Sequence, residues 1–315
     1  MARTHGPLVV IVGPTAVGKT TVSLYLAKAL EGEIVSADSR QVYRGMDVGT
    51  DKATPSQRAL VPHHLLGIRS PDEPLSLAEY QRLAYAAIDD ILDRGRLPFL
   101  VGGSGQYVLA VLEGWGIPEV PPDEALRARL EMEAEQEGYC KLHARLQAMD
   151  PVAASRIDPR NVRRVIRALE VCLKTGQRIS DLQSKRPPPY DLLWLGLTLP
   201  RALLYQRVDE RVEQMIAAGL VAEVERLLTA GYSLDMPAMS GLGYRQIGDF
   251  LQGRCTLEEA IQAIKHETHR FVRQQYTWFR LNDPRIRWYD LSVTDPDQIL
   301  ADVQAWLNAE RSGNP

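Results

Sequence analysis

Cysteine, long apolar runs and net positive charge are all scarce in this sequence of 315 residues. The three cysteines, Cys140, Cys172 and Cys255, form no CxxC pair and no zinc-site spacing with histidine, which favours reduced thiols over a metal centre. No run of about 18 apolar residues is present, so no membrane-spanning helix is expected. The first apolar segment begins at Leu8, which leaves no room for a signal peptide. Together these absences predict a cytoplasmic protein with no membrane partner.

The formal net charge of −3 predicts no polyanion partner, but the charge is unevenly distributed. Between Ala154 and Arg186 there are nine Lys or Arg residues against three acids, and between Lys265 and Arg287 there are six against two. Two basic segments on an acidic chain are expected of a protein that binds nucleic acid on part of its surface. Composition alone fits scattered, solvated charge equally well.

Strand and helix patterns alternate in the first part of the chain. Short segments at Leu8–Val12, Glu33–Asp38 and Pro98–Val101 predict buried strands. Helical spacing at Thr20–Ala29 and Leu77–Arg94 predicts helices between them. Such alternation predicts an α/β fold with an open parallel sheet.

The pattern changes after a proline-rich linker at residues 118–122. From Asp123 to about Lys185 it is almost wholly helical, and strand character returns at Leu192–Leu197. The chain is then largely helical until a late strand at Ile286–Tyr289. We therefore predict an α/β core formed by residues 1–117 and 190–315, interrupted by a helical insertion at residues 118–189.

Between the first predicted strand and helix, the sequence GPTAVGKT fits the P-loop pattern GxxxxGK[ST]. In such a loop backbone N–H groups and the following helix N-terminus point at phosphate oxygens. The lysine adds a full charge, and the terminal hydroxyl can ligate Mg²⁺. The motif predicts a phosphate site, without identifying the compound, at Gly13, Thr15, Ala16, Val17, Gly18, Lys19 and Thr20.

The acid that P-loop NTPases place after a second apolar strand is missing, because Phe99–Val101 is followed by Gly102–Gly105. Asp38 instead ends the strand at residues 33–38. If the strands are parallel, its carboxylate lies at the sheet edge beside the P-loop and could accept a proton from a nucleophile. Spacing alone favours a simpler interpretation, in which Asp38 or Ser39 caps a following helix.

Arg163, Arg164 and Arg167 are three and four residues apart in a predicted helix, with few internal partners, which suits contact with a phosphate backbone or a solvated face. The segment Lys265–Arg280 interleaves basic residues with four aromatic rings, a pattern that suits unstacked bases, although most such rings belong to a core. The pair His63–His64 has no third ligand near it in sequence, so metal binding has little support.

Several blocks, taken in chain order, resemble the tRNA dimethylallyltransferases of bacterial type, also called isopentenyl-diphosphate:tRNA transferases. The most specific is Asp38–Thr50, DSRQVYRGMDVGT. The others are Gly13–Thr20, His63–His64, Val101–Gly105, Arg167–Val171, Gly243–Arg245 and Gln275–Arg280. The resemblance runs from about residue 8 to 280, which is nearly the whole chain.

The resemblance implies transfer of a dimethylallyl group from dimethylallyl diphosphate to the exocyclic amine of the adenine immediately 3′ of the tRNA anticodon. It implies a P-loop kinase-like core with a helical insertion that contacts the anticodon stem-loop. The P-loop would hold the donor diphosphate, with Mg²⁺ at Thr20. By this resemblance Asp38 becomes the general base and Arg211 the arginine at the phosphate, so that Asp38, Thr20 and Arg211 form the catalytic set.

Matching positions, with the second basic segment, also assign a wider set of tRNA contacts. These are Asp38, Ser39, Arg40, Gln41, Ser104, Arg163, Arg164, Val165, Ile166, Arg167, Ser240, Gly243, Tyr244, Arg245, Arg273 and Arg280. The chain departs from the family pattern at Val17, where Ser is common, at Ser104, where Thr is usual, and at Gln274, where a basic residue is frequent.

Two alternatives belong to other functional classes. A P-loop small-molecule or nucleotide kinase would use ATP at the same loop but gives the basic segment Arg160–Arg167 no role. An RNA-binding module with a phosphate-sensing P-loop would bind RNA without turnover. Nothing in the sequence demands an obligate protein partner, so a monomer is expected.

Overall fold

The computed structural model describes residues 6–186, 188 and 190–313, which divide into two compact units. One unit contains the chain up to Val108 and again from residue 190 onward, and the other runs from Leu109 to Pro188. The insertion expected from residue 118 therefore begins earlier, within helix α4 (Gly105–Leu112). Among the described residues, no helix combines enough length with enough apolar character to pass through a lipid bilayer.

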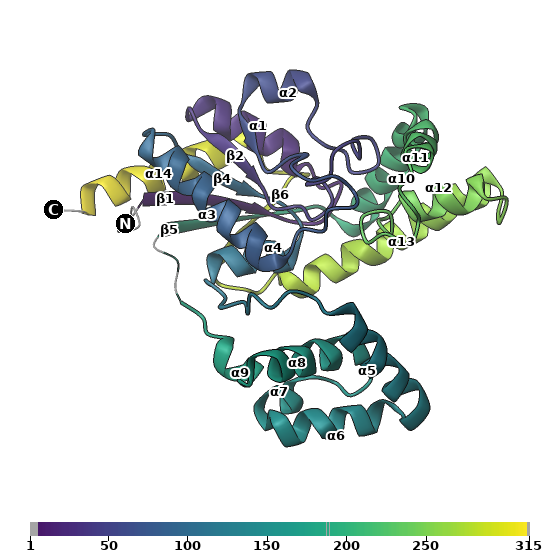
Figure 1. The fold of residues 1–315 in the computed structure, drawn as a ribbon. Coiled ribbons are helices and arrows are strands. Elements are labelled where there is room, and N and C mark those ends of the chain that lie inside the picture. Colours follow the sequence, from purple (N-terminus) through teal and green to yellow (C-terminus); the bar gives the residue numbers. More distant parts are fainter. Residues whose placement is uncertain (1–5, 187, 189, 314–315) are drawn as a thin grey trace. The chain divides into compact units, whose positions relative to one another are not determined.

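The first unit is built on a six-stranded sheet whose neighbouring strands are all parallel. The strand order is β3-β2-β4-β1-β5-β6 (Figure 1). The strands are β1 (Gly6–Val12), β2 (Glu33–Ser36), β3 (His63–His64), β4 (Pro98–Val101), β5 (Tyr190–Thr198) and β6 (Ile286–Asp290). All except β3 lie where the sequence predicts them, which confirms the α/β fold. The two residues of β3 are too few to show a periodicity.

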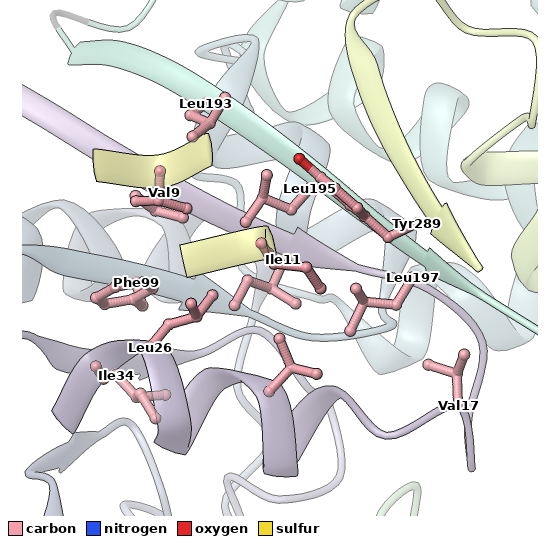
Figure 2. Close-up of a cluster of buried hydrophobic side chains, with 14 of the residues drawn as sticks. Val9, Ile11, Val17, Leu26, Ile34, Phe99, Leu193, Leu195, Leu197 and Tyr289 are labelled. Carbon is pink, nitrogen blue, oxygen red and sulfur yellow. The ribbon is translucent and has the colours of Figure 1, made fainter. Parts of the chain in front are cut away.

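Helices cover both faces of this sheet (Figure 1). Besides the start of α4, the helices of this unit are α1 (Lys19–Ala29), α2 (Pro55–Leu60), α3 (Leu77–Asp93), α10 (Arg201–Ala217), α11 (Leu220–Thr229), α12 (Tyr244–Leu251), α13 (Leu257–Trp278) and α14 (Pro296–Gly313). Helices α11 and α12 do not cover the sheet and pack against α10 and α13 instead (Figure 1). On one face Val9 and Ile11 pack with residues of α1, α10, α13 and α14 in a buried cluster (Figure 2). Because strand side chains alternate, the equally buried Leu8 and Val10 point to the other face.

The carboxyl ends of β1, β2 and β4 meet at one edge of the sheet because these strands are parallel neighbours. The loops that follow β2 and β4 approach very closely there. A Cβ atom on Gly102 would lie 2.1 Å from the Ala37 carbonyl oxygen, so only glycine fits. The P-loop, the loop that begins at Asp38 and the Gly102–Gly105 turn therefore lie side by side at this edge.

The regular structure in the described residues of the second unit is helical, apart from an isolated antiparallel bridge between Trp115 and Lys185. After α4 it contains α5 (Glu124–Glu137), α6 (Tyr139–Met149), α7 (Pro151–Arg156), α8 (Val162–Thr175) and α9 (Ile179–Leu182). Leu130, Leu142, Leu146 and Leu169 belong to its own buried core. A separate apolar core explains why this segment forms a compact unit.

Candidate active site

The P-loop has the geometry that its sequence predicts. Gly13 has φ +147°, and a Cβ atom there would lie 2.5 Å from the Leu197 carbonyl oxygen. Gly18 has φ +110° and caps α1 without a side-chain hydrogen bond, which leaves the first-turn N–H groups available to an anion. Ala16 also adopts a positive φ, 62°. Such strain is typical of a functional loop whose backbone conformation matters more than its side chains.

Lys19 folds back over this loop. Its Nζ donates to the carbonyl oxygens of Gly13 (3.0 Å) and Pro14 (2.8 Å). Burial, and next the charge of Arg211, lower the pKa of Lys19 to about 8, against the opposing effect of Asp38 and Asp51. Because burial disfavours the charged form of Lys19, an anion bound beside it would stabilise that charge.

Two arginines of α10 reach the P-loop from the side. Arg211 Nη1 donates to Thr15 Oγ1 (3.0 Å), and its Nη2 lies 3.4 Å from Asp51 Oδ2. Arg207 Nη1 donates to the Val17 carbonyl oxygen at 3.5 Å. Arg211 was expected at this site, whereas Arg207 is a further site residue; the spacing of four residues places both on one helix face.

Asp38 follows β2 and lies within electrostatic range of Lys19. Its Oδ1 accepts the backbone N–H groups of Arg40 (2.8 Å) and Gln41 (3.3 Å). No helix follows, because residues 39–42 form turns, so the interpretation of Asp38 or Ser39 as a helix cap is wrong. Within the described residues Asp38 Oδ2 accepts no hydrogen bond, which leaves one carboxylate oxygen free to take a proton.

Ser39, Gln41 and Ser104 connect this loop to its neighbours. Ser104 Oγ accepts the Ser39 backbone N–H at 3.0 Å. The Gln41 amide accepts from Ser36 Oγ (3.2 Å) and donates to the Thr50 carbonyl oxygen (3.1 Å). These contacts fix the loop after β2 against the turn after β4.

Gln275 is a site residue whose role the sequence analysis did not identify. Its buried side chain accepts the Thr15 N–H (2.8 Å) and donates to the Gly103 carbonyl oxygen (3.1 Å). It therefore ties the P-loop to the turn after β4. The partners lie 260 and 172 positions away in sequence, so only membership of the block Gln275–Arg280 pointed to it.

The structure brings the segment 237–245 against the Asp38 loop. The Arg40 guanidinium donates to the carbonyl oxygens of Pro237 and Ala238 and to Ser240 Oγ, the last at 3.4 Å. Tyr244 is 1% exposed, so its ring is not available to RNA in this conformation. Gly243, with φ +89°, begins α12, and the exposed Arg245 pairs with Glu267 at 2.6 Å.

Arg273 of α13 and Arg280, which follows the end of this helix, are exposed. Arg273 donates to the Tyr205 hydroxyl at 3.0 Å. The aromatic residues between them are largely inside: Phe279 is buried, and the Tyr276 hydroxyl bonds Thr198 Oγ1 at 2.8 Å. The basic groups therefore remain accessible, whereas most rings serve the core, as expected of a helix.

The arginines of helix α8 in the second unit differ in exposure and in hydrogen bonding. Arg163 and Arg164 are exposed and make no ion pair within the described residues. Arg163 also lines a hollow of about 490 Å³ together with Asp158, Arg160, Asn161 and Val162. These guanidinium groups are free to meet phosphates. Val165 and Ile166 are buried, so neither is available to RNA in this conformation.

Arg167 is different, and the expectation that it has few internal partners is wrong. Its Nη1 donates to Glu170 Oε2 (2.6 Å) and to the Val120 carbonyl oxygen (3.0 Å), and its Nη2 donates to the Pro118 carbonyl oxygen (3.3 Å). Glu170 is fully buried and also accepts from Arg127. Arg167 therefore holds the proline-rich linker against α8.

The protein groups near the P-loop are too few to hold a metal ion by themselves, but they suit an ion that is also bound by the substrate. No cluster of three or more His, Cys, Asp or Glu side chains that could bind a metal occurs in the described ranges. His64 instead bonds Glu33 at 2.7 Å, and His63 bonds the Val61 carbonyl oxygen at 2.8 Å. The Thr20 hydroxyl makes no hydrogen bond among the described residues, so it is free for a ligand.

Comparison with known sequences identifies the relatives of this chain. A family model described as IPP transferase matches residues 41–282, and one described as isopentenyl transferase matches residues 6–63. A tRNA dimethylallyltransferase of Roseiflexus sp. (strain RS-1) is 56% identical over 304 residues, covering 96% of this chain and 99% of that protein. Another, of Thermomicrobium roseum, is 56% identical over 307 residues, covering 96% and 92%.

Solved structures agree. The full-length tRNA isopentenylpyrophosphate transferase from Bacillus halodurans superposes with a TM-score of 0.71 at 44% identity, covering 96% of each chain. A eukaryotic dimethylallyltransferase acting on tRNA gives a TM-score of 0.81 at 25% identity, covering 99% of this chain and 81% of that chain. These matches confirm the resemblance found in the sequence, and the chain belongs to the IPP transferase family of tRNA dimethylallyltransferases.

Proposed function

We propose that this protein transfers a dimethylallyl group from dimethylallyl diphosphate to the exocyclic amine of the adenine immediately 3′ of the anticodon in tRNA. The observation that carries the proposal is the position of Asp38. Its free Oδ2 lies at the sheet edge that also carries the P-loop, Lys19 and Arg211. A general base and a diphosphate cradle at one edge are what transfer from a diphosphate to an amine requires.

On the donor side the P-loop takes the diphosphate. As the bond between the allylic carbon and the diphosphate oxygen breaks, negative charge grows on the leaving group. Backbone N–H groups, Lys19 and Arg211 stabilise that charge without having to reorganise. Arg207, which lies beside the Val17 carbonyl oxygen, adds a second guanidinium group nearby.

The Thr20 hydroxyl, which is free of other hydrogen bonds among the described residues, would hold Mg²⁺ together with the substrate diphosphate. Mg²⁺ prefers oxygen donors and is commonly held by substrate phosphates with few protein groups. When bound, the ion neutralises part of the charge of the diphosphate.

On the acceptor side Asp38 acts as the general base. The backbone N–H groups of Arg40 and Gln41 hold Oδ1, which orients Oδ2 toward the incoming amine. An exocyclic adenine amine is a weak nucleophile, so removal of its proton as the new C–N bond forms assists the reaction. The adenine must leave its stack to reach this position, and a loop base does so at lower cost than a paired one.

We propose that tRNA is bound by exposed polar groups on both units. In the second unit these are Arg163 and Arg164. In the first unit they are the exposed Ser240, Arg245, Arg273 and Arg280 and the partly exposed Ser39, Arg40, Gln41 and Ser104. Gly243 is buried, and it is proposed as a further contact from the resemblance alone. Arginines supply phosphate contacts that fix the register of the RNA, and the small polar groups near Asp38 lie where the target base must enter. We expect the enzyme to act as a monomer in the cytoplasm.

A kinase that uses ATP at the same loop is the competing function. Sequence relatives and the absence of an acid after β4 both weigh against it. The test uses anticodon stem-loops that differ only in carrying adenine or unsubstituted purine at the position 3′ of the anticodon. Dimethylallyl diphosphate with Mg²⁺ should modify the adenine substrate alone, and ATP should give no product. Equal modification of the purine substrate, or ATP turnover, would refute the proposal.

A further inference from the structure

Glu223 of α11 is a buried carboxylate that accepts four hydrogen bonds. It is 3% exposed. Its Oε2 accepts the backbone N–H groups of Asp47 (3.0 Å) and Val48 (2.8 Å). Its Oε1 accepts the Gly49 N–H (3.1 Å) and the Tyr244 hydroxyl (2.6 Å). Charge-assisted bonds of this kind are about twice as strong as neutral ones, so the carboxylate is a firm anchor for the loop.

The segment Asp47–Gly49, which Glu223 holds, is linked to the P-loop through Asp51 and Arg211. Two residues after Gly49 comes Asp51, which holds the positive φ of 50° and places Oδ2 3.4 Å from Arg211 Nη2. Arg211 in turn donates to Thr15 Oγ1. The Gln41 side chain ties the start of the same loop to this stretch, because its Nε2 donates to the carbonyl oxygens of Thr50 and Asp51.

Tyr244 contacts both Glu223 and the segment that Glu223 holds. Its ring packs against Gly49, where a Cβ atom would lie 2.7 Å from the ring atoms Cε2 and Cζ. Burial, and next the charge of Glu223, raise the pKa of the Tyr244 hydroxyl far above its usual range, so the group stays a donor. Tyr244 also stands between Gly243 and Arg245, which are proposed to contact tRNA.

We propose that Glu223 and Tyr244 are positioning residues that fix the segment Asp47–Asp51, and through Asp51 the orientation of Arg211 at the P-loop. The inference rests on the proposed function, which gives Arg211 its role at the leaving diphosphate. Neither residue touches the reacting groups. The arrangement also links the segment 240–245 to the diphosphate site through one carboxylate, Glu223.

The first test is Glu223→Gln, which keeps the size of the side chain but turns one acceptor into a donor facing backbone N–H groups. The rate of transfer in a single turnover at saturating substrates should fall about 10- to 100-fold, since small misplacements of a catalytic group have effects of this size. Affinity for tRNA should change far less than the rate. Glu225→Gln is the matched control, because Glu225 is exposed on the same helix, and it should leave the rate unchanged.

A double-mutant cycle with Arg211→Lys separates positioning from mere loss of stability. If Glu223 acts through Arg211, the double variant should lose much less than the product of the two single losses. Asp51→Asn alters a side chain that is 58% exposed, so it tests the same path without disturbing the core. In the cycle of Asp51→Asn with Arg211→Lys, the double variant should likewise lose less activity than the product of the two single losses. If Glu223→Gln does not fold, this second cycle tests whether the segment Asp47–Asp51 acts through Arg211.

The inference would be overturned if the rate losses of the single variants multiplied in both double variants, or if Glu223→Gln kept the wild-type rate. A wild-type protein that fails to transfer the dimethylallyl group would instead refute the proposed function. In that event the same two cycles, measured as affinity for inorganic pyrophosphate, still decide whether Glu223 and Asp51 act through Arg211.

Discussion

The binding of a diphosphate should weaken as the pH rises above 8, because above that pH Lys19 stays charged only when an anion is beside it. Burial and the Arg211 charge lower the pKa of Lys19 to about 8 in the free protein. A bound diphosphate favours the charged form and raises this pKa again. Above pH 8 the complex therefore holds more protons than the free protein, so binding takes up a proton and loses affinity as the pH rises. A free-state pKa of about 8 corresponds to a loss of about tenfold between pH 7 and pH 9.

The assay is titration calorimetry with dimethylallyl diphosphate and Mg²⁺ at several pH values, in buffers that differ in ionisation enthalpy. The terminal phosphate has a second pKa of about 6, so the ligand is already ionised over this range. Lys19→Arg is the control, since a guanidinium keeps its charge and should abolish the pH dependence even if affinity falls. Constant affinity of the wild type from pH 7 to pH 9, or the same slope in Lys19→Arg, would refute this reasoning.

Four further changes test other parts of the structure. Asp38→Asn retains an oxygen for the loop N–H groups but cannot accept the amine proton, so single-turnover transfer should slow about 100-fold or more while tRNA binding persists; an unchanged rate would remove the base role. Arg163→Ala should weaken tRNA binding and lower its salt dependence by about one phosphate contact without changing Tm. Arg167→Ala should lower Tm in thermal melts, and an unchanged Tm would contradict its structural role. Glu33→Gln should cost about 2 kcal/mol of unfolding free energy at pH 7. Hydrogen bonds from Arg94 lower the pKa of Glu33 to about 2, so this contribution is present above the unfolded value and lost as the pH falls through 2; equal losses in urea unfolding at pH 7 and pH 2 would contradict this account.

Features that depend on neighbouring residues could be predicted from the sequence. The P-loop Gly13–Thr20 could be predicted because its glycines, lysine and threonine have a fixed spacing within eight residues, between a strand and a helix. The place of Asp38 at the same edge followed from the parallel sheet alone. Its role as a base did not, because spacing equally fitted a cap, and the resemblance to a family supplied it.

Features that depend on distant partners could not be predicted. Gln275 reaches the P-loop across 260 positions, and Glu223 reaches Asp47 across 176, so neither contact leaves a local pattern. Arg167 was misjudged for a related reason. Its acceptors on Pro118 and Val120 are backbone carbonyl groups, which no side-chain pattern reveals. Its pairing with Glu170, three residues along the same helix, could have been predicted from the spacing.

The most direct test of the central claim is single-turnover transfer of label from dimethylallyl diphosphate to an unmodified tRNA with adenine 3′ of its anticodon. Asp38→Asn and a reaction supplied only with ATP run beside the wild type. Label on that adenine with the wild-type protein alone is the predicted result. Consumption of ATP with no label on the tRNA would contradict the account and establish the kinase function in its place.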